Sequence, residues 1–208
     1  MHAMIKAKSL ESRTVASRLM SAGKALFARL GYDLAATAAI AREAGTSESQ
    51  LVRYFGGKAG LLEAICNEDW QALNIRLRNG AVESPHAQGA LLNLAMMTGA
   101  AFADDPDFGY LAIFEEHRLR AGDAALLNSQ GYLDFNAMVM RLIRRGQRDG
   151  SFAAGLNEAF LEAAIIGALE SMLRGRLTAQ RAGKPPPGSD EDFRLTFAAL
   201  LAGFAEQK

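Results

Sequence analysis

The sequence predicts an all-α fold, with an N-terminal three-helix helix-turn-helix domain followed by a C-terminal helical bundle, about nine helices in total. Apolar residues recur at helical spacing along nearly the whole chain. Alternating runs of β-branched residues, which are typical of strands, are not found, and Ala and Leu dominate. The turn-rich stretch "NGAVESPHAQG", residues 79–89, separates the early helices from the bundle.

The first predicted helix covers about residues 15–30 and presents one apolar face to the core. That face is lined by Val15, Leu19, Ala22, Leu26 and Leu30. Gly31 is expected to end this helix as a left-handed C-terminal cap. Two short helices follow at about 37–44 and 47–55, and "GGK" separates them from a longer helix at about 59–77.

Five helices are expected beyond the turn-rich stretch. They cover about 87–103, 107–120, 123–148, 158–181 and the end of the chain after 189. Asn157 can cap the fourth of them, and Ser189 with Asp192 resembles a capping box that opens the last. The linker "AGKPPPGS" between these two helices cannot be helical, because proline lacks the N–H that a helix needs.

Gly45 interrupts a helical pattern in "IAREAGTSESQLVRYFGGK", residues 40–58. In a helix-turn-helix, two helices meet at roughly 90–120° across a short turn, and the turn needs a residue that tolerates positive φ. Ala41 offers a small side chain where the helices cross, while Leu51 and Phe55 face back towards the first helix. The polar residues after Gly45 then lie on the outer face of the second helix, which can enter the major groove of DNA.

The N-terminal end of the chain is basic, although the net charge of the whole chain is zero. Residues 1–58 contain nine Lys or Arg and four Asp or Glu, a net charge of +5, so the remainder carries −5. A basic end on a neutral protein predicts an anionic partner, and double-stranded DNA is the expected one. No histidine pair has metal-ligand spacing and no nucleophile accompanies Glu115 and Glu116, so we expect no metal, no cofactor and no enzyme activity.

The order "ALFARLGYDLAATAAIAREAGTSESQLVRYFGGKAGLLEAI" strongly resembles the N-terminal domain of the TetR (tetracycline-repressor-like) family of transcriptional regulators. The resemblance covers about residues 13–70 and rests on Leu26-Phe27, Gly31-Tyr32, Ile40-Ala41, Ala44-Gly45, Ser47, Leu51, Phe55, Lys58 and Leu61-Leu62. It implies a homodimeric, ligand-responsive repressor that a small apolar or amphipathic effector releases from DNA. We accordingly expect a basic arm and DNA-binding domain at 1–58, a connecting helix and turn at 59–86, and an effector-binding and dimerisation bundle at 87–208.

Seven residues on or near the second helix of the motif are expected to contact DNA. Gln can pair with adenine and Arg with guanine, whereas hydroxyl groups bond phosphate oxygens. Lys58 matches the phosphate-contacting Lys of the family. The predicted DNA-binding residues are Thr37, Ser47, Ser49, Gln50, Arg53, Tyr54 and Lys58. A solvated helix face is the alternative interpretation of Gln50 and Arg53.

The bundle is rich in methionine and phenylalanine, which either fill a core or form the adaptable walls of a ligand site. The resemblance favours the ligand site, with a few polar side chains orienting the effector. The predicted pocket residues are Asn93, Met97, Tyr110, Phe114, His117, Asn136, Met140 and Met172.

Apolar stripes also run along the last two helices, where they either complete the core or pair with a second copy across a two-fold axis. The second interpretation, which the family implies, predicts a dimer interface at Ile165, Leu169, Phe197, Leu201 and Phe204.

A helical protein that binds small molecules such as acyl chains, with a degenerate helix-turn-helix, is the alternative function. Ala36, Glu48 and Val52 favour it, because the family usually has Thr or Ser, Lys or Arg, and Tyr at these positions. No apolar run approaches the ~18 residues of a membrane span, and the start of the chain has no signal-peptide core. A cytoplasmic protein without a membrane partner is therefore expected.

Overall fold

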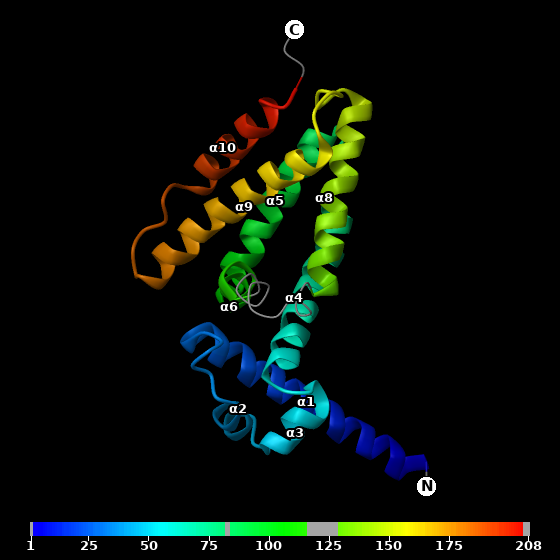
Figure 1. Cartoon of the computed structure of the whole chain (residues 1–208), viewed down its shortest axis with the longest axis vertical. Coiled ribbons are helices and arrows are strands. Elements are labelled where there is room, and N and C mark those ends of the chain that lie inside the picture. The colour runs from blue at the N-terminus through cyan, green and yellow to red at the C-terminus, as the bar shows by residue number, and fades with distance from the viewer. Residues whose placement is uncertain (1, 82–83, 116–128, 206–208) are drawn as a thin grey trace. The chain divides into compact units, whose positions relative to one another are not determined.

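The computed structural model describes residues 2–81, 84–115 and 129–205. These residues form nine α-helices and one π-helix, and no strand occurs in the described ranges (Figure 1), which confirms the all-α prediction. The chain divides into two compact units. The first consists of the described residues of Met1–Asp69 and Tyr110–Ser129, and the second of those of Trp70–Gly109 and Gln130–Lys208.

The first unit is built around the helix-turn-helix. Its helices are α1 (His2–Leu30), α2 (Thr37–Glu43), α3 (Glu48–Phe55) and the first half of α4 (Lys58–Ala81). Gly31 ends α1 with φ 79° and donates its N–H to the Phe27 carbonyl at 2.8 Å, as the predicted left-handed cap requires. The core of this unit is formed by Leu19, Leu26, Phe27, Ile40, Leu51, Leu61 and Leu62.

The boundary between the units falls within α4, between Asp69 and Trp70, and not in the turn-rich stretch at 79–89. The reason is that α4 continues without a break while its partners change. In its first half, Asp69 forms an ion pair with Lys24 of α1 at 2.8 Å. In its second half, Asn74 donates its Nδ2–H to the Gly131 carbonyl of α8 at 2.7 Å.

A single helix is predicted at 107–120, and over its described residues, up to 115, the structure has two short helices instead. These are α6 (Pro106–Tyr110) and the π-helix η1 (Leu111–Glu115). The π-helix η1 belongs to the first unit. Its last residue, Glu115, is 1% exposed and accepts a hydrogen bond from the Tyr32 backbone N–H at 3.2 Å. A buried carboxylate thus holds the turn that joins α1 to α2.

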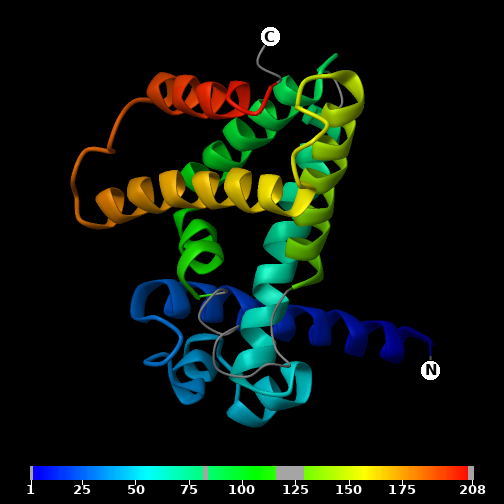
Figure 2. The ribbon, with the colours of Figure 1, turned by 45° about the horizontal axis from the view of Figure 1, so that its top comes forward.

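The second unit contains α5 (Ala87–Asp104), α8 (Gln130–Asp149), α9 (Glu158–Arg181) and α10 (Asp190–Ala202). Within it α5 packs against α8 and α10, and α9 packs against α8 and α10 (Figures 1 and 2). Five aromatic side chains form the centre of this core: the indole of Trp70 and four rings whose centroids lie 4.9–6.1 Å from it. They are Trp70, Phe102, Phe108, Tyr132 and Phe135.

The start of each of the last two helices is capped as the sequence predicted. The Asn157 side chain accepts from the N–H groups of the second and third residues of α9. Ser189 and Asp192 form a complete capping box at α10, and hydrogen bonds from Ser189 lower the pKa of the Asp192 carboxyl. Arg176 holds the intervening loop, seen at the side of Figure 2, by donating to the Ser189 carbonyl at 2.6 Å.

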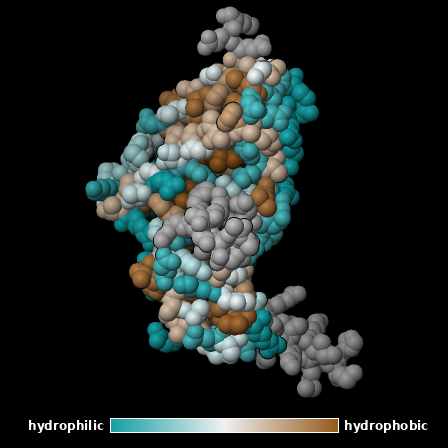
Figure 3. Space-filling model, viewed as in Figure 1, coloured by the Kyte–Doolittle hydropathy of each residue, from teal (hydrophilic) through white to brown (hydrophobic). Residues whose placement is uncertain are grey.

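Hydrophilic residues are interspersed with hydrophobic ones on the face shown in Figure 3. Among the described residues, no helix combines the length and the apolar character that crossing a membrane requires.

Candidate DNA-binding surface

The corner between α2 and α3 is a Schellman motif centred on Gly45. Gly45 has φ 62° and donates its N–H to the Arg42 carbonyl at 3.1 Å, while the Thr46 N–H reaches the Ala41 carbonyl at 2.9 Å. A Cβ at Gly45 would meet no described atom within 4 Å, so backbone conformation, and not lack of space, requires glycine here. Ala41 and Leu51 are buried where the two helices meet, as predicted.

The outer face of α3 differs in part from the predicted one. Its exposed residues are Glu48, Ser49, Val52 and Arg53. At ~100° per residue these four lie within an arc of roughly 140° around the helix axis, opposite buried Leu51. We call them the outer arc of α3. Gln50 and Tyr54, predicted to point outward, are half-buried at its edge.

Glu48 and Val52 are not among the predicted DNA-binding residues, and both depart from the family pattern. Their position on the outer arc follows from the spacing i, i+1, i+4, i+5 with Ser49 and Arg53, once Leu51 is placed in the core. The side chain of Val52 is 55% exposed. A helical wheel of residues 48–55 therefore suffices to predict that Glu48 and Val52 face outward.

Side-chain hydroxyl groups form hydrogen bonds at the starts of α2 and α3. The Thr37 hydroxyl donates to Oε2 of Glu48 at 2.6 Å, and the hydroxyls of Ser47 and Ser49 lie 2.8 Å apart. Ser47 takes the N-cap backbone conformation, but within the described structure its side chain does not bond to the backbone of α3. The Ser47 hydroxyl instead forms a hydrogen bond with the hydroxyl of Ser49.

Lys58, predicted to contact phosphate, lies against the turn between α1 and α2. Its Nζ donates to the carbonyls of Tyr32 at 2.8 Å and Asp33 at 3.3 Å, and lies 4.4 Å from the centroid of the Tyr32 ring. An ammonium group has three donors, so these two carbonyls leave capacity for a phosphate oxygen. The side chain therefore stabilises the turn whether or not it also meets DNA.

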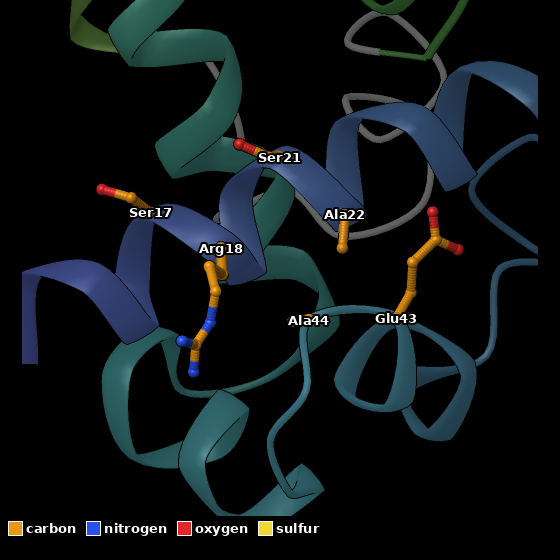
Figure 4. A pocket seen from close by; sticks show the side chains of 6 residues that line it. All are labelled: Ser17, Arg18, Ser21, Ala22, Glu43 and Ala44. Carbon is orange, nitrogen blue, oxygen red and sulfur yellow. The ribbon is translucent and has the colours of Figure 1, made fainter.

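A shallow hollow of about 370 Å³ lies between α1 and the end of α2 (Figure 4). It is lined by Ser17, Arg18, Ser21, Ala22, Glu43 and Ala44. The guanidinium of Arg18 and the carboxylate of Glu43 point in different directions in Figure 4. With opposite charges on its two walls, the hollow favours neither a cationic nor an anionic ligand.

The predicted effector-pocket residues are dispersed. In the second unit Met97, Asn136, Met140 and Met172 are half-buried, while Asn93 is exposed on α5, outside the core that an internal pocket requires. Tyr110 and Phe114 belong to the first unit, where their rings stack with centroids 4.9 Å apart. His117 lies outside the described residues.

The second unit contains two buried amide oxygens, those of Asn74 and Asn136. Asn136 is among the predicted pocket residues, and Asn74 is not. Oδ1 of Asn74 and Oδ1 of Asn136 have no hydrogen-bond partner among the residues that the structure describes. The Asn74 amide orientation is fixed, since its Nδ2–H donates to the Gly131 carbonyl. Each oxygen can accept a hydrogen bond from a bound molecule or from water.

The predicted dimer-interface residues need correction. Ile165, Leu169, Phe197 and Leu201 are 0–3% exposed within a single chain, so they cannot face a partner. Phe204 is half-buried, with its ring 6.3 Å from that of Phe152. Periodicity identified real apolar stripes, but α5 and α8 of the same chain cover them.

The exposed surface of α9 and α10 includes charged residues such as Arg174 and Glu191, and also a set of mostly small, uncharged side chains. We call this set the outer face of α9 and α10. It consists of Phe160, Ala163, Ala164, Gly167, Ser171, Leu195, Thr196 and Ala199. Phe160 is 78% exposed and Leu195 is 52% exposed.

The sequence model described as bacterial regulatory proteins, tetR family, matches residues 19–65. This range contains the second half of α1, all of α2 and α3, and the start of α4. This N-terminal region is of the tetR type. The match includes the Gly45 corner and the outer arc of α3, so the resemblance found in the sequence is confirmed.

Similar proteins include the nucleoid occlusion factor SlmA of Pasteurella multocida (strain Pm70), which is 27% identical over 127 residues. This stretch covers 59% of the present chain and 64% of SlmA, so less than two thirds of that relative is matched.

Solved structures of tetR-like fold match over nearly the whole chain. The fatty acid degradation regulator FadR of Bacillus halodurans has a TM-score of 0.76 at 19% identity, over 91% of this chain and 99% of that one. FadR of Bacillus subtilis, solved in complex with stearoyl-CoA, has a TM-score of 0.75 at 16% identity over the same shares. These likenesses show the fold, including that of the C-terminal helices.

Proposed function

We propose that this protein is a sequence-specific DNA-binding transcriptional repressor of the tetR type, which a small apolar or amphipathic effector releases from DNA. The observation that carries the proposal is the outer arc of α3, held outward by the Gly45 corner and by buried Leu51. A helix presented in this way can enter the major groove with its N-terminal residues at the base edges.

Charge and neighbouring groups support the same surface. The range 1–58 carries a net charge of +5, which favours approach to a polyanion. Thr37, Ser47 and Ser49 place hydroxyl groups at the starts of α2 and α3, where they can position phosphates. Gln50 and Tyr54 lie at the edge of the outer arc, and Lys58 near the α1–α2 turn.

Replacing Arg53 by Ala tests the proposed contact directly. If Arg53 bonds a guanine, the variant should lose ~1–3 kcal/mol of binding free energy on the preferred duplex and tolerate any base at one position. Binding should be measured by fluorescence anisotropy on duplexes selected from a random library.

Arg29→Ala is the matched control, because Arg29 is exposed in the same unit but lies on α1. It should leave base preference intact. Equal affinity of the wild type and Arg53→Ala for every duplex would remove Arg53 from the interface.

The proposed effector site lies in the second unit. Half-buried Met97, Met140 and Met172 offer adaptable apolar surface, and the Asn136 oxygen can orient a donor group of the ligand. The complex of Bacillus subtilis FadR with stearoyl-CoA supports an amphipathic ligand. His117 stays a prediction, since it lies outside the described residues.

A true effector must bind the DNA-free state more tightly than the DNA-bound state. Compounds that raise the melting temperature should therefore be titrated with and without the preferred duplex. A coupling of ~1–3 kcal/mol, or roughly a 5–150-fold change in either affinity, is expected. Identical affinities in both titrations would show that the compound is no effector.

A homodimer completes the proposal, because one helix-turn-helix on one half-site binds weakly. We place the interface on the outer face of α9 and α10. Ala163, Ala164 and Gly167 allow two helices to approach closely, while Phe160 and Leu195 supply apolar area.

A helical ligand carrier with a degenerate helix-turn-helix is the second candidate. Exposed Glu48 favours it, since a carboxylate on the outer arc repels phosphate. Salt-dependent binding to duplex DNA separates the two functions, because a carrier should show none.

A further inference from the structure

A carboxylate stands at the start of α3, on the surface proposed to meet DNA. Glu48 is the first residue of α3, and its Oε2 accepts the Thr37 hydroxyl hydrogen at 2.6 Å. This bond links the side chain to the start of α2 and restricts its rotamers. A long flexible side chain that is already restrained loses less entropy when it binds a partner.

Helix stability alone does not account for the position of Glu48. An acidic residue in the first turn of a helix interacts favourably with the macrodipole, but any position of that turn serves this purpose. Glu48 instead lies on the outer arc beside Val52 and Ser49, where every other exposed side chain is uncharged or basic. A carboxylate among phosphates costs binding energy unless it finds a donor.

The major groove offers such a donor at cytosine. A carboxylate only accepts hydrogen bonds, and the edges of guanine and thymine present acceptors. Adenine has an amino group, but its N7 acceptor lies beside it and repels a carboxylate. The cytosine amino group has no acceptor of its own base next to it in the groove, so it is the best partner for a carboxylate.

We propose that Glu48 is a specificity-determining residue that accepts a hydrogen bond from the amino group of a cytosine in each half-site. The inference rests on the proposed DNA-binding function and specifies its base preference. Thr37 positions the carboxylate by occupying one lone pair of Oε2, which leaves Oε1 for the base. Arg53 lies five residues further along the arc, ~7.5 Å along the axis, and so reaches a different base pair.

The test is a selection of duplexes from a random library by the wild type and by Glu48→Gln. The wild type should select cytosine at one position of each half-site, and the variant should select adenine there, because Gln pairs with the N6 and N7 groups of adenine. Replacing the selected cytosine by 2-pyrimidinone, which lacks the amino group, should weaken wild-type binding by roughly 5- to 100-fold. The same replacement should leave binding by Glu48→Ala unchanged.

Thr37→Val is the matched variant for the positioning role. It removes the hydroxyl but keeps the carboxylate. A lost phosphate contact would weaken binding to all duplexes equally, so the positioning role predicts in addition a smaller ratio between the affinities for duplexes with and without the selected cytosine. Melting temperatures of the Glu48 and Thr37 variants, measured alongside, verify that the unit is folded.

Two results overturn the inference in distinguishable ways. If the wild type binds duplexes with salt dependence but Glu48→Gln selects the same base at every position, Glu48 does not read sequence and the DNA-binding function stands. If the wild type binds no duplex at low salt, the proposed function itself fails, and this inference fails with it.

Discussion

Gly167→Arg is expected to convert a dimer into a folded monomer and to weaken binding to a two-half-site duplex by about 100- to 10,000-fold. Gly167 lies on the exposed side of α9, where a Cβ would meet no described atom within 4 Å. The single chain therefore has space for a larger side chain. Across a two-fold axis, however, the arginine enters the interface twice, with bulk and like charge.

Sedimentation at micromolar concentration measures the change in oligomeric state, and thermal unfolding verifies the fold. Gly in a helix interior is unfavourable relative to other residues, so the substitution should not destabilise α9. Ala137→Arg, at an exposed position of α8, is the matched control and should stay dimeric. A Gly167→Arg protein that remains dimeric would place the interface elsewhere.

Phe197→Asp is expected to unfold the second unit and not to release a folded monomer. Phe197 is 1% exposed and its ring stacks on Phe193 with centroids 6.2 Å apart. Truncating a buried Phe costs ~3–5 kcal/mol, and an unpaired buried carboxylate adds several more. Because a domain is stable by only about 5–15 kcal/mol, little or no folded protein should remain.

Chemical denaturation followed by circular dichroism gives the stability of the Phe197 variants. Phe197→Leu, which keeps the site apolar, should retain most of the stability and the native oligomeric state. A soluble Phe197→Asp monomer with the wild-type melting temperature would show that this ring faces a partner and not the core.

Local chemistry made several features predictable from the sequence. Gly31 and Gly45 have the positive φ values that their positions in the pattern required, and Asn157 and Ser189 form the expected caps. Each of these depends on residues a few positions apart. The tetR motif at residues 19–65 could be recognised for the same reason, since it lies within one short stretch. The all-α fold class is confirmed by the helices of the described residues.

Features that depend on contacts between distant residues were not predictable. Helical periodicity reveals an apolar stripe, but it cannot tell whether α5 of the same chain or a second copy covers Phe197. The bond between Thr37 and Glu48 joins residues eleven positions apart, and the clamp of Lys58 on the Tyr32 carbonyl joins residues twenty-six apart. Neither pair has a sequence pattern of its own.

Binding of the wild-type protein to DNA as a function of salt tests the central claim most directly. A duplex with two selected half-sites and a scrambled duplex of equal length should be titrated between about 50 and 200 mM salt. The logarithm of the affinity should fall linearly with the logarithm of the salt concentration, by a factor of roughly 10³–10⁵ if six to ten phosphates are contacted. The affinity for the scrambled duplex should be lower by a factor of at least about 10³. Absence of binding at low salt, or equal affinity for both duplexes, would contradict a sequence-specific DNA-binding protein.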